Sequence, residues 1–148
     1  MKKVTEDYAT QCFQNGIDCS QIVFSYGASQ HGFEEKQAMK IAAPFGGGMW
    51  YGETCGCVIG ALMAIGLQYG NDGFGQVDIK QKLLAKKTEF EARFKEKHNS
   101  LICREILGYD LSKEEDMKII MDKGLFFTLC NKVAVSACEI LDDVLKSE

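Results

Sequence analysis

One stretch of the chain, residues 55–67, is almost entirely apolar and lies between two glycine-rich segments. A helix that is apolar on all of its faces belongs in the interior of a protein. The stretch is shorter than the ~20 residues that a membrane span requires. It therefore predicts a buried central helix over residues 53–69, which other helices must surround.

The rest of the chain carries the spacing of amphipathic helices. Apolar residues recur at intervals of three and four, strand-like alternation is almost absent, and Pro44 is the only proline. The 148 residues suit one domain. We therefore predict an all-α fold, a single domain over residues 1–148 that forms a bundle of about six to eight helices around residues 53–69. The other helices are expected over residues 5–14, 19–26, 33–42, 77–97, 100–107, 112–123 and 125–145.

Several helix ends are marked by residues with known capping preferences. Asp18 with Gln21, and Ser112 with Glu115, have the spacing of capping boxes. In such a box, the cap side chain and a side chain three residues later satisfy free backbone N–H groups. Gly27 is expected to end the second helix, because glycine commonly stops a helix.

The composition limits the classes of partner. Charged residues make up 26% of the chain, the net charge is -4, and Lys and Arg form no long block. Such a chain is not suited to a nucleic-acid backbone, so we expect neither a nucleic-acid partner nor a membrane span. Glu6, Asp7 and Gln11 interrupt the segment where a signal peptide needs an apolar stretch. We therefore expect a cytoplasmic protein.

Seven cysteines are the main candidates for chemistry in this chain. An odd number of cysteines in a reducing compartment does not indicate a disulfide framework. Redox cycling, metal ligation and core packing remain as their roles. The cysteines are Cys12, Cys19, Cys55, Cys57, Cys103, Cys130 and Cys138.

Three of these cysteines fall at the predicted starts of helices. Cys19 directly follows the cap Asp18, and Cys55 and Cys103 fall in the first turns of their own helices. Free backbone N–H groups and the helix dipole at such positions can lower a thiol pKa from ~8.5 to ~3.5–7.5. A thiolate can act as a nucleophile or as a metal ligand. The alternative is that these side chains are buried and pack as small hydrophobic groups.

Cys55 and Cys57 form a C-x-C pair within the predicted central helix. Two positions apart on a helix correspond to about 200° of rotation, so the two side chains are expected on opposite faces. We expect Cys55 to be functional and Cys57 to point elsewhere. Cys12 stands alone on an amphipathic helix and is expected to serve packing.

The segment before the central helix is rich in glycine. Gly46, Gly47 and Gly48 could hold an anion through their backbone N–H groups. Alternatively, they form a turn that allows the backbone to approach the cysteines closely. Trp50 and Tyr51 follow directly and are candidates for lining a pocket.

The central helix also carries a strip of small residues. Gly56, Gly60 and Ala64 recur at intervals of four, which lets a second helix approach closely. That helix could come from the same chain or from the second copy of a homodimer. His98 lies five residues before Cys103 and is a candidate base for it.

The cysteine pattern resembles that of the C_GCAxxG_C_C family of short bacterial and archaeal redox-active proteins. Cys19 looks like the first cysteine of that pattern, residues 55–60 look like its CGAxxG element, and Cys103 and Cys130 look like the third and fourth cysteines. Cys57 stands where the pattern has alanine, which leaves open an additional ligand or resolving thiol. The resemblance implies a redox class and four functional residues, and it implies no substrate.

Two functional hypotheses follow for Cys19, Cys55, Cys103 and Cys130. In the first, these residues converge on one site for thiol–disulfide or electron-transfer chemistry with a redox partner or small molecule, as in a thiol-dependent oxidoreductase. Cys55 is then expected to be the attacking thiolate. In the second, the same four cysteines bind zinc or an iron–sulfur cluster. A scaffold whose cysteines only pack is the third alternative.

Overall fold

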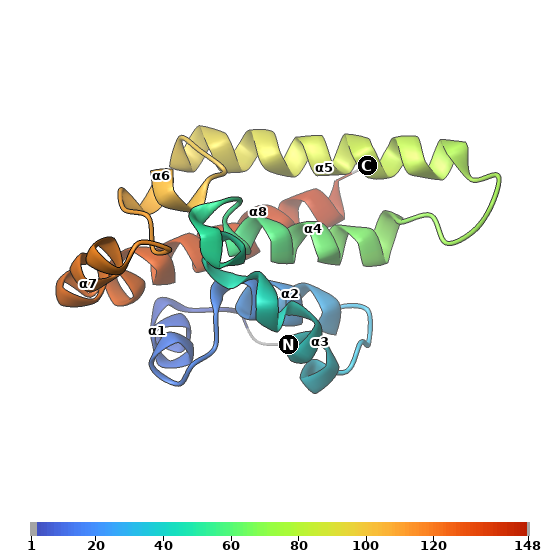
Figure 1. Cartoon of the computed structure of the whole chain (residues 1–148). Coiled ribbons are helices and arrows are strands. Elements are labelled where there is room, and N and C mark those ends of the chain that lie inside the picture. The colour runs from blue at the N-terminus through green and yellow to red at the C-terminus, as the bar shows by residue number, and fades with distance from the viewer. Residues whose placement is uncertain (1–2, 148) are drawn as a thin grey trace.

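The computed structural model describes residues 3–147. Within this range the chain forms eight α-helices and no β-strand (Figure 1), which confirms the predicted all-α fold. The α-helices are α1 (Glu6–Gln14), α2 (Cys19–Ser29), α3 (Glu35–Ala42), α4 (Gly56–Tyr69), α5 (Val77–His98), α6 (Cys103–Leu107), α7 (Glu114–Lys123) and α8 (Asn131–Lys146). Short helical segments lie at η1 (Ala43–Phe45), η2 (Gly48–Gly52) and η3 (Phe126–Cys130).

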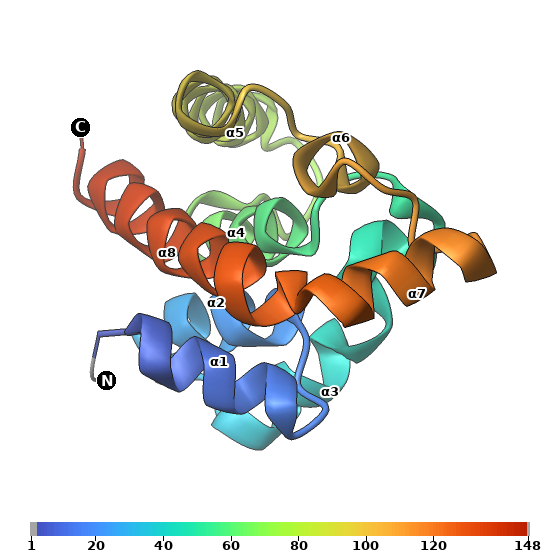
Figure 2. The ribbon, with the colours of Figure 1, turned by 90° about the vertical axis from the view of Figure 1, so that its left-hand side faces the viewer.

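Helix α4 is the central helix that the apolar stretch predicts. It packs against α2, α5 and α8, and these helices surround it in Figures 1 and 2. Val58, Ala61 and Ile65 are fully buried, whereas Leu67 near the end of the helix is exposed. The helix begins at Gly56, three residues later than the predicted 53.

The strip of small residues on α4 contacts α2 of the same chain. A Cβ atom on Gly60 would lie 2.7 Å from the carbonyl oxygen of Ser20, so only glycine allows this approach. Gly27 contributes the matching gap on α2, because a Cβ atom there would lie 2.5 Å from the Cβ of Ala64. The prediction that Gly27 ends α2 is therefore wrong: the helix continues to Ser29, and Gly27 is a packing residue within it.

One of the two predicted capping boxes exists. Asp18 caps α2, and its backbone N–H donates to Oε1 of Gln21 at 2.9 Å. The box predicted at Ser112 does not form, because the Ser112 hydroxyl donates to Oδ1 of Asp110 at 2.6 Å. Lys113 occupies the N-cap position of α7 without a capping hydrogen bond from its side chain.

Two other predicted boundaries lie elsewhere in the structure. The helix predicted over residues 100–107 is the shorter α6, which begins at Cys103 because the backbone of Ile102 before it is extended. The helix predicted over residues 125–145 is η3 followed by α8. No single helix among the described residues is long and apolar enough to cross a membrane. Within residues 3–147, one bent pair, Glu114–Lys123 and Phe126–Lys146, passes the test for length and composition when the two helices are taken together.

The buried side chains form a main core and a smaller second cluster. The main core surrounds α4, whereas the second cluster includes Leu107, Leu111 and Ile120 from α6, α7 and the loop between them. Cys103 belongs to the second cluster, and Leu129 of η3 packs against both. Figure 1 shows that α4 and α6 both begin at the end of the bundle near α7.

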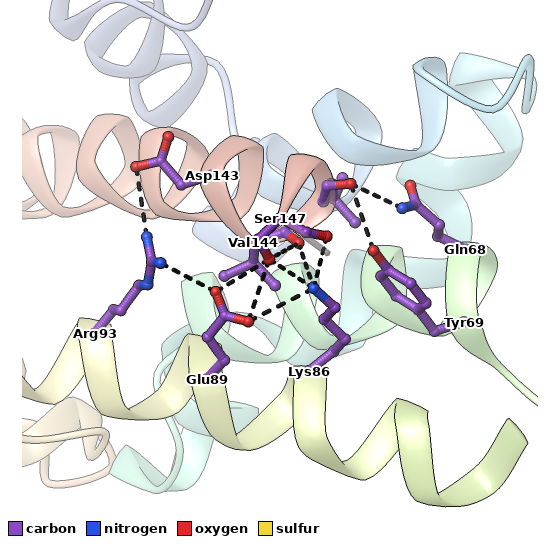
Figure 3. A network of polar contacts seen from close by, with 9 residues as sticks. Gln68, Tyr69, Lys86, Glu89, Arg93, Asp143, Val144 and Ser147 are labelled. Atoms are coloured by element: carbon purple, nitrogen blue, oxygen red, sulfur yellow. Dashed lines mark hydrogen bonds and ion pairs between the residues drawn. The ribbon is translucent and has the colours of Figure 1, made fainter. Parts of the chain in front are cut away.

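At the opposite end, side chains from α4 and α5 hold the last turn of α8 (Figure 3). Lys86 is only 5% exposed, and its ammonium group donates to the carbonyl oxygens of Val144 at 3.4 Å and Ser147 at 2.9 Å. The side chain of Gln68 donates to the carbonyl oxygen of Leu145 at 2.9 Å. Carbonyl groups in the last turn have no partner within their helix, so these contacts satisfy them.

Candidate functional site

A cavity of about 240 Å³ lies between the main core and the second cluster. Residues from α1, α2, α4, α6, α7, α8, η2, η3 and the connecting segments line it. Its walls include five of the seven cysteines, all as free thiols. The cavity brings together the four cysteines named as candidates and one that was not: Cys19, Cys55, Cys103, Cys130 and Cys57.

Cys19 is the first residue of α2, as its position after Asp18 predicts. The thiols of Cys55 and Cys57 donate hydrogen bonds to the Cys19 sulfur, as do the backbone N–H groups of Gly47 and Ser20. These hydrogen bonds hold the pKa of Cys19 well below the ordinary value of a thiol, against the opposing effect of burial. Cys19 is therefore the residue of the site that is set up to ionise.

Cys55 differs from the expectation that it carries the thiolate. It is the N-cap of α4, with φ -53° and ψ 134°, and does not lie within the first turn. Its hydrogen bond to Cys19 raises the pKa of its own thiol, because donation requires the proton to stay. The directions of the two pKa shifts therefore favour Cys19 over Cys55 as the thiol that ionises first.

Cys57 does not point away from the other cysteines. The rotation of about 200° that separates two such positions applies only when both lie within the helix, and Cys55 lies before it. Cys57 is 1% exposed, and its hydrogen bonds to Cys19 and then to Cys55 raise the pKa of its thiol. The prediction that Cys57 points away from the other cysteines is therefore wrong.

Gly56 allows Cys19 to reach this position. A Cβ atom on Gly56 would overlap Sγ of Cys19 and would lie 3.1 Å from the carbonyl oxygen of Phe45. The glycine at the start of α4 thus leaves the space that the thiolate occupies. A larger residue at this position would separate Cys19 from its two thiol donors.

The glycine-rich loop approaches Cys19 through its backbone. Gly47, Gly48, Met49 and Trp50 all have φ between 58° and 62°, so the chain forms a left-handed turn. This conformation costs a non-glycine residue roughly 1–2 kcal/mol. The turn directs the N–H of Gly47 to the Cys19 sulfur. The group that the loop contacts in this structure is therefore the sulfur of Cys19.

Asp18 is a residue of the site that sequence reasoning treated only as a helix cap. Its side chain lines the cavity and packs against Gly46, where a Cβ atom would lie 2.6 Å from the Asp18 Cβ. Burial, and then the negative charge of Cys19, raises the Asp18 pKa to about 6. The signal was present in the sequence, because a cap residue directly before a helix-start cysteine must lie beside it.

The segments that precede α4 and α6 are joined by an isolated antiparallel bridge. The N–H of Cys55 donates to the carbonyl oxygen of Leu101 at 2.7 Å, and the N–H of Cys103 donates to that of Glu53 at 2.6 Å. This bridge holds Cys103 on the same cavity as Cys55. Burial raises the pKa of Cys103 to about 12 and also raises that of Cys130, so both remain protonated thiols.

The remaining walls of the cavity are apolar. Trp50 is 43% exposed and Met121 is 52% exposed, so these two line its outer part. Tyr51 does not line the cavity. His98 does not line it either, and its Nε2 atom lies 2.8 Å from the hydroxyl of Ser136. The apolar lining residues are Phe13, Trp50, Ile106, Leu107, Leu111, Met117, Met121, Phe126, Phe127 and Val133.

The alternative of a zinc or iron–sulfur site needs a set of ligands in a suitable arrangement. Among residues 3–147, no group of three or more His, Cys, Asp or Glu side chains could hold a metal ion. Cys19, Cys55, Cys103 and Cys130 share a cavity without forming such a group. The observed arrangement does not fit a metal centre built from these four ligands.

Comparison with known proteins identifies a family for this chain. A family model described as "Putative redox-active protein (C_GCAxxG_C_C)" matches residues 17–144. The matched range contains every cysteine that lines the cavity. No curated protein and no solved structure shows a significant match to the chain.

Proposed function

The chain belongs to the C_GCAxxG_C_C family of redox-active proteins, and from this we propose that it is a thiol–disulfide oxidoreductase with Cys19 as its nucleophile. One observation carries the proposal: Cys19 receives hydrogen bonds from two neighbouring thiols and two backbone N–H groups beside a cavity. The thiolate is the reactive form of cysteine in thiol–disulfide exchange. A second thiol within hydrogen-bonding reach can complete the reaction.

The reaction has two displacements. The Cys19 thiolate attacks one sulfur of a substrate disulfide, the substrate S–S bond breaks, and the first half leaves as a thiolate. The Cys55 thiol then attacks Sγ of Cys19, and its proton goes to the second departing half. The substrate gains two electrons and becomes two thiols, one of them ionised, while the protein forms a Cys19–Cys55 disulfide.

Cys55 is assigned the second attack because its thiol lies within hydrogen-bonding reach of the Cys19 sulfur. Cys55 also precedes α4, whereas Cys57 lies within the helix and is almost fully buried. Cys57 then acts as a hydrogen-bond donor that stabilises the thiolate. Cys103 and Cys130 are not among the hydrogen-bond donors to the Cys19 sulfur, and they take no step in the proposed reaction.

Alkylation with iodoacetamide at pH 7 and peptide mapping by mass spectrometry tests the identity of the nucleophile. We expect Cys19 to be labelled first and the Cys19→Ser variant to lose the fast phase. A Cys12→Ser variant is the matched control, because Cys12 is buried outside the cavity. After oxidation, mapping should find Cys19 joined to Cys55. Labelling of Cys12 or Cys138 as fast as Cys19 would contradict the proposal.

A further inference from the structure

The charge of the residues that line the cavity favours some substrates over others. Among the described residues, Asp18 is the only one of the Asp, Glu, Lys, Arg and His classes that lines the cavity, and ionisation of Cys19 would add a second negative charge beside it. A carboxylate or phosphate on a substrate would find no cationic partner in the cavity. Clefts with charge of one sign repel ligands of the same sign and slow their entry. An anionic disulfide is therefore a poor fit to this site.

The size of the cavity sets a second limit. Its volume is about 240 Å³, which is below the ~300–1,000 Å³ that is common for sites of drug-sized ligands. An apolar cavity of about 150 Å³ in another protein holds a benzene molecule. The present cavity therefore has room for one aromatic ring and a few further atoms. The second half of a disulfide would extend toward the outer part of the cavity.

The walls indicate which neutral group fits. Phe13 from α1 stacks on Phe126 from η3, with ring centroids 6.1 Å apart and planes at 19°. The thioether of Met117 and the ring of Trp50 complete apolar surfaces that line the same cavity. Aromatic rings and thioethers make favourable contacts with further aromatic rings.

We propose that the substrates of this site are small, uncharged disulfides with apolar or aromatic substituents, an inference that rests on the proposed thiol–disulfide function. One substituent occupies the cavity, and the S–S bond reaches Cys19. Attack by Cys19 breaks that bond and releases the outer substituent as a thiolate. Cys55 then displaces the inner substituent as a thiol, which leaves the Cys19–Cys55 disulfide.

Two aromatic disulfide reagents that differ in charge test the inference. Dithiodipyridine is uncharged at pH 7, whereas dithiobis(nitrobenzoate) carries two carboxylates, and both release a coloured thiol. The rate of reaction at Cys19 is the rate measured for the protein minus the rate measured for its Cys19→Ser variant. For each reagent, this rate is divided by the rate at which the same reagent reacts with free mercaptoethanol, which corrects for its intrinsic reactivity. We expect the normalised rate of the uncharged reagent to exceed that of the anionic reagent by about tenfold or more. This is the scale at which the charge of a cleft alters association rates.

Two lysine variants on α7 provide the matched comparison. Met121 lines the cavity and is 52% exposed, whereas Ile119 is 37% exposed on the same helix and does not line it. Met121→Lys should accelerate the anionic reagent relative to the uncharged one by several-fold, because it adds a cation beside the cavity. Ile119→Lys should leave the ratio closer to that of the unmodified protein.

The outcomes separate the two proposals. Normalised rates that are equal for the two reagents would overturn the inference on substrate class and leave the thiol–disulfide function standing. The same holds if Met121→Lys and Ile119→Lys change the ratio equally. If neither reagent forms a mixed disulfide at Cys19 or a Cys19–Cys55 disulfide, as judged by mass spectrometry, the proposed function itself is overturned.

Discussion

Cys19 owes its acidity to donors from separate segments of the chain. Cys55 and Cys57 come from the start of α4, Gly47 comes from the left-handed turn, and Ser20 belongs to α2 itself. A hydrogen bond to a charged group contributes about 1.5–3 kcal/mol, which corresponds to about one to two pKa units. Each of the thiol donors should therefore have a measurable effect on the ionisation of Cys19.

Replacing Cys57 by Ala should raise the pKa of Cys19, because one of the hydrogen-bond donors to its sulfur is lost. The pH dependence of iodoacetamide labelling at Cys19 measures the shift. Cys138→Ala is the control, since Cys138 is buried but does not line the cavity. An unchanged labelling profile in Cys57→Ala would show that Cys57 does not stabilise the thiolate.

Asp18 gives a second prediction at the scale of one residue. Its pKa is raised to about 6, so ionisation of Asp18 disfavours the folded state. Its contribution to stability is therefore present below the unfolded value of ~3.9 and is lost as the pH rises through about 6. Asn is an equally good helix cap that does not ionise. Asp18→Asn should increase the free energy of unfolding at pH 7 by about 1 kcal/mol, after allowing for solvent screening.

Urea unfolding at pH 7 and at pH 4 checks this effect of Asp18→Asn. The gain should be present at pH 7 and nearly absent at pH 4, where the carboxyl group of the unmodified protein is largely protonated. Asp122→Asn removes a carboxylate from an exposed position on α7 and controls for the change in net charge. A gain of the same size at both pH values would mean that ionisation of Asp18 is not its cause.

At the scale of elements, the contact between α2 and α4 depends on glycines, which have no side chain to keep the two helices apart. Gly60 is in contact with the backbone of α2, whereas nothing lies within 4 Å of a Cβ atom on Gly66 of the same helix. Gly60→Ala should lower the free energy of unfolding by roughly 1–3 kcal/mol through overpacking. Gly66→Ala should raise it by about 0.5–1 kcal/mol, because alanine favours a helix over glycine.

Chemical denaturation of the two alanine variants measures these opposite effects. Because both positions lie in α4, the gain in helix propensity is the same for both, and the difference between the variants isolates the packing of α2. If Gly60→Ala were as stable as Gly66→Ala, the two helices would not be held in close contact by the glycine.

The start of α4 also shows where prediction from sequence reached its limit. Asp18 with Gln21 marks the start of α2, so Cys19 could be placed correctly at its first position. No such cap marks the start of α4, and the helix was predicted to begin before Cys55. Because of this error, Cys57 was predicted to lie on the opposite face of the helix from Cys55. The left-handed conformation of Gly47 gave no local signal beyond its glycines, so its donation to Cys19 could not be predicted.

At the scale of the whole molecule, the all-α fold and the buried central helix were predictable because apolar spacing alone determines them. Only the family resemblance indicated that Cys103 and Cys130 lie near Cys19. In the structure it depends on the bridge between the segments before α4 and α6 and on the packing of η3 against α8 and α1. Such long-range contacts carry no periodic signature in the sequence.

Lys86 lies outside the cysteine-lined cavity. Its contacts with the end of α8 lead to a prediction about the free energy of unfolding of the whole protein. Lys86→Met keeps the length of the side chain but removes the donors to the carbonyl oxygens of Val144 and Ser147. Loss of hydrogen bonds from a charged group to buried carbonyls should lower the free energy of unfolding by about 2 kcal/mol. Labelling of Cys19 in the folded protein should stay unchanged, because Lys86 does not line the cavity.

Lys82→Met is the matched control, since Lys82 is exposed on the same helix and also lies over the ring of Tyr69. Thermal and urea unfolding should show a large loss for Lys86→Met and little change for Lys82→Met. Equal losses would mean that the contact of each ammonium group with Tyr69, and not the end of α8, accounts for the stabilisation. A slower labelling of Cys19 in Lys86→Met alone would instead indicate that the two ends of the bundle are coupled through α8 and η3.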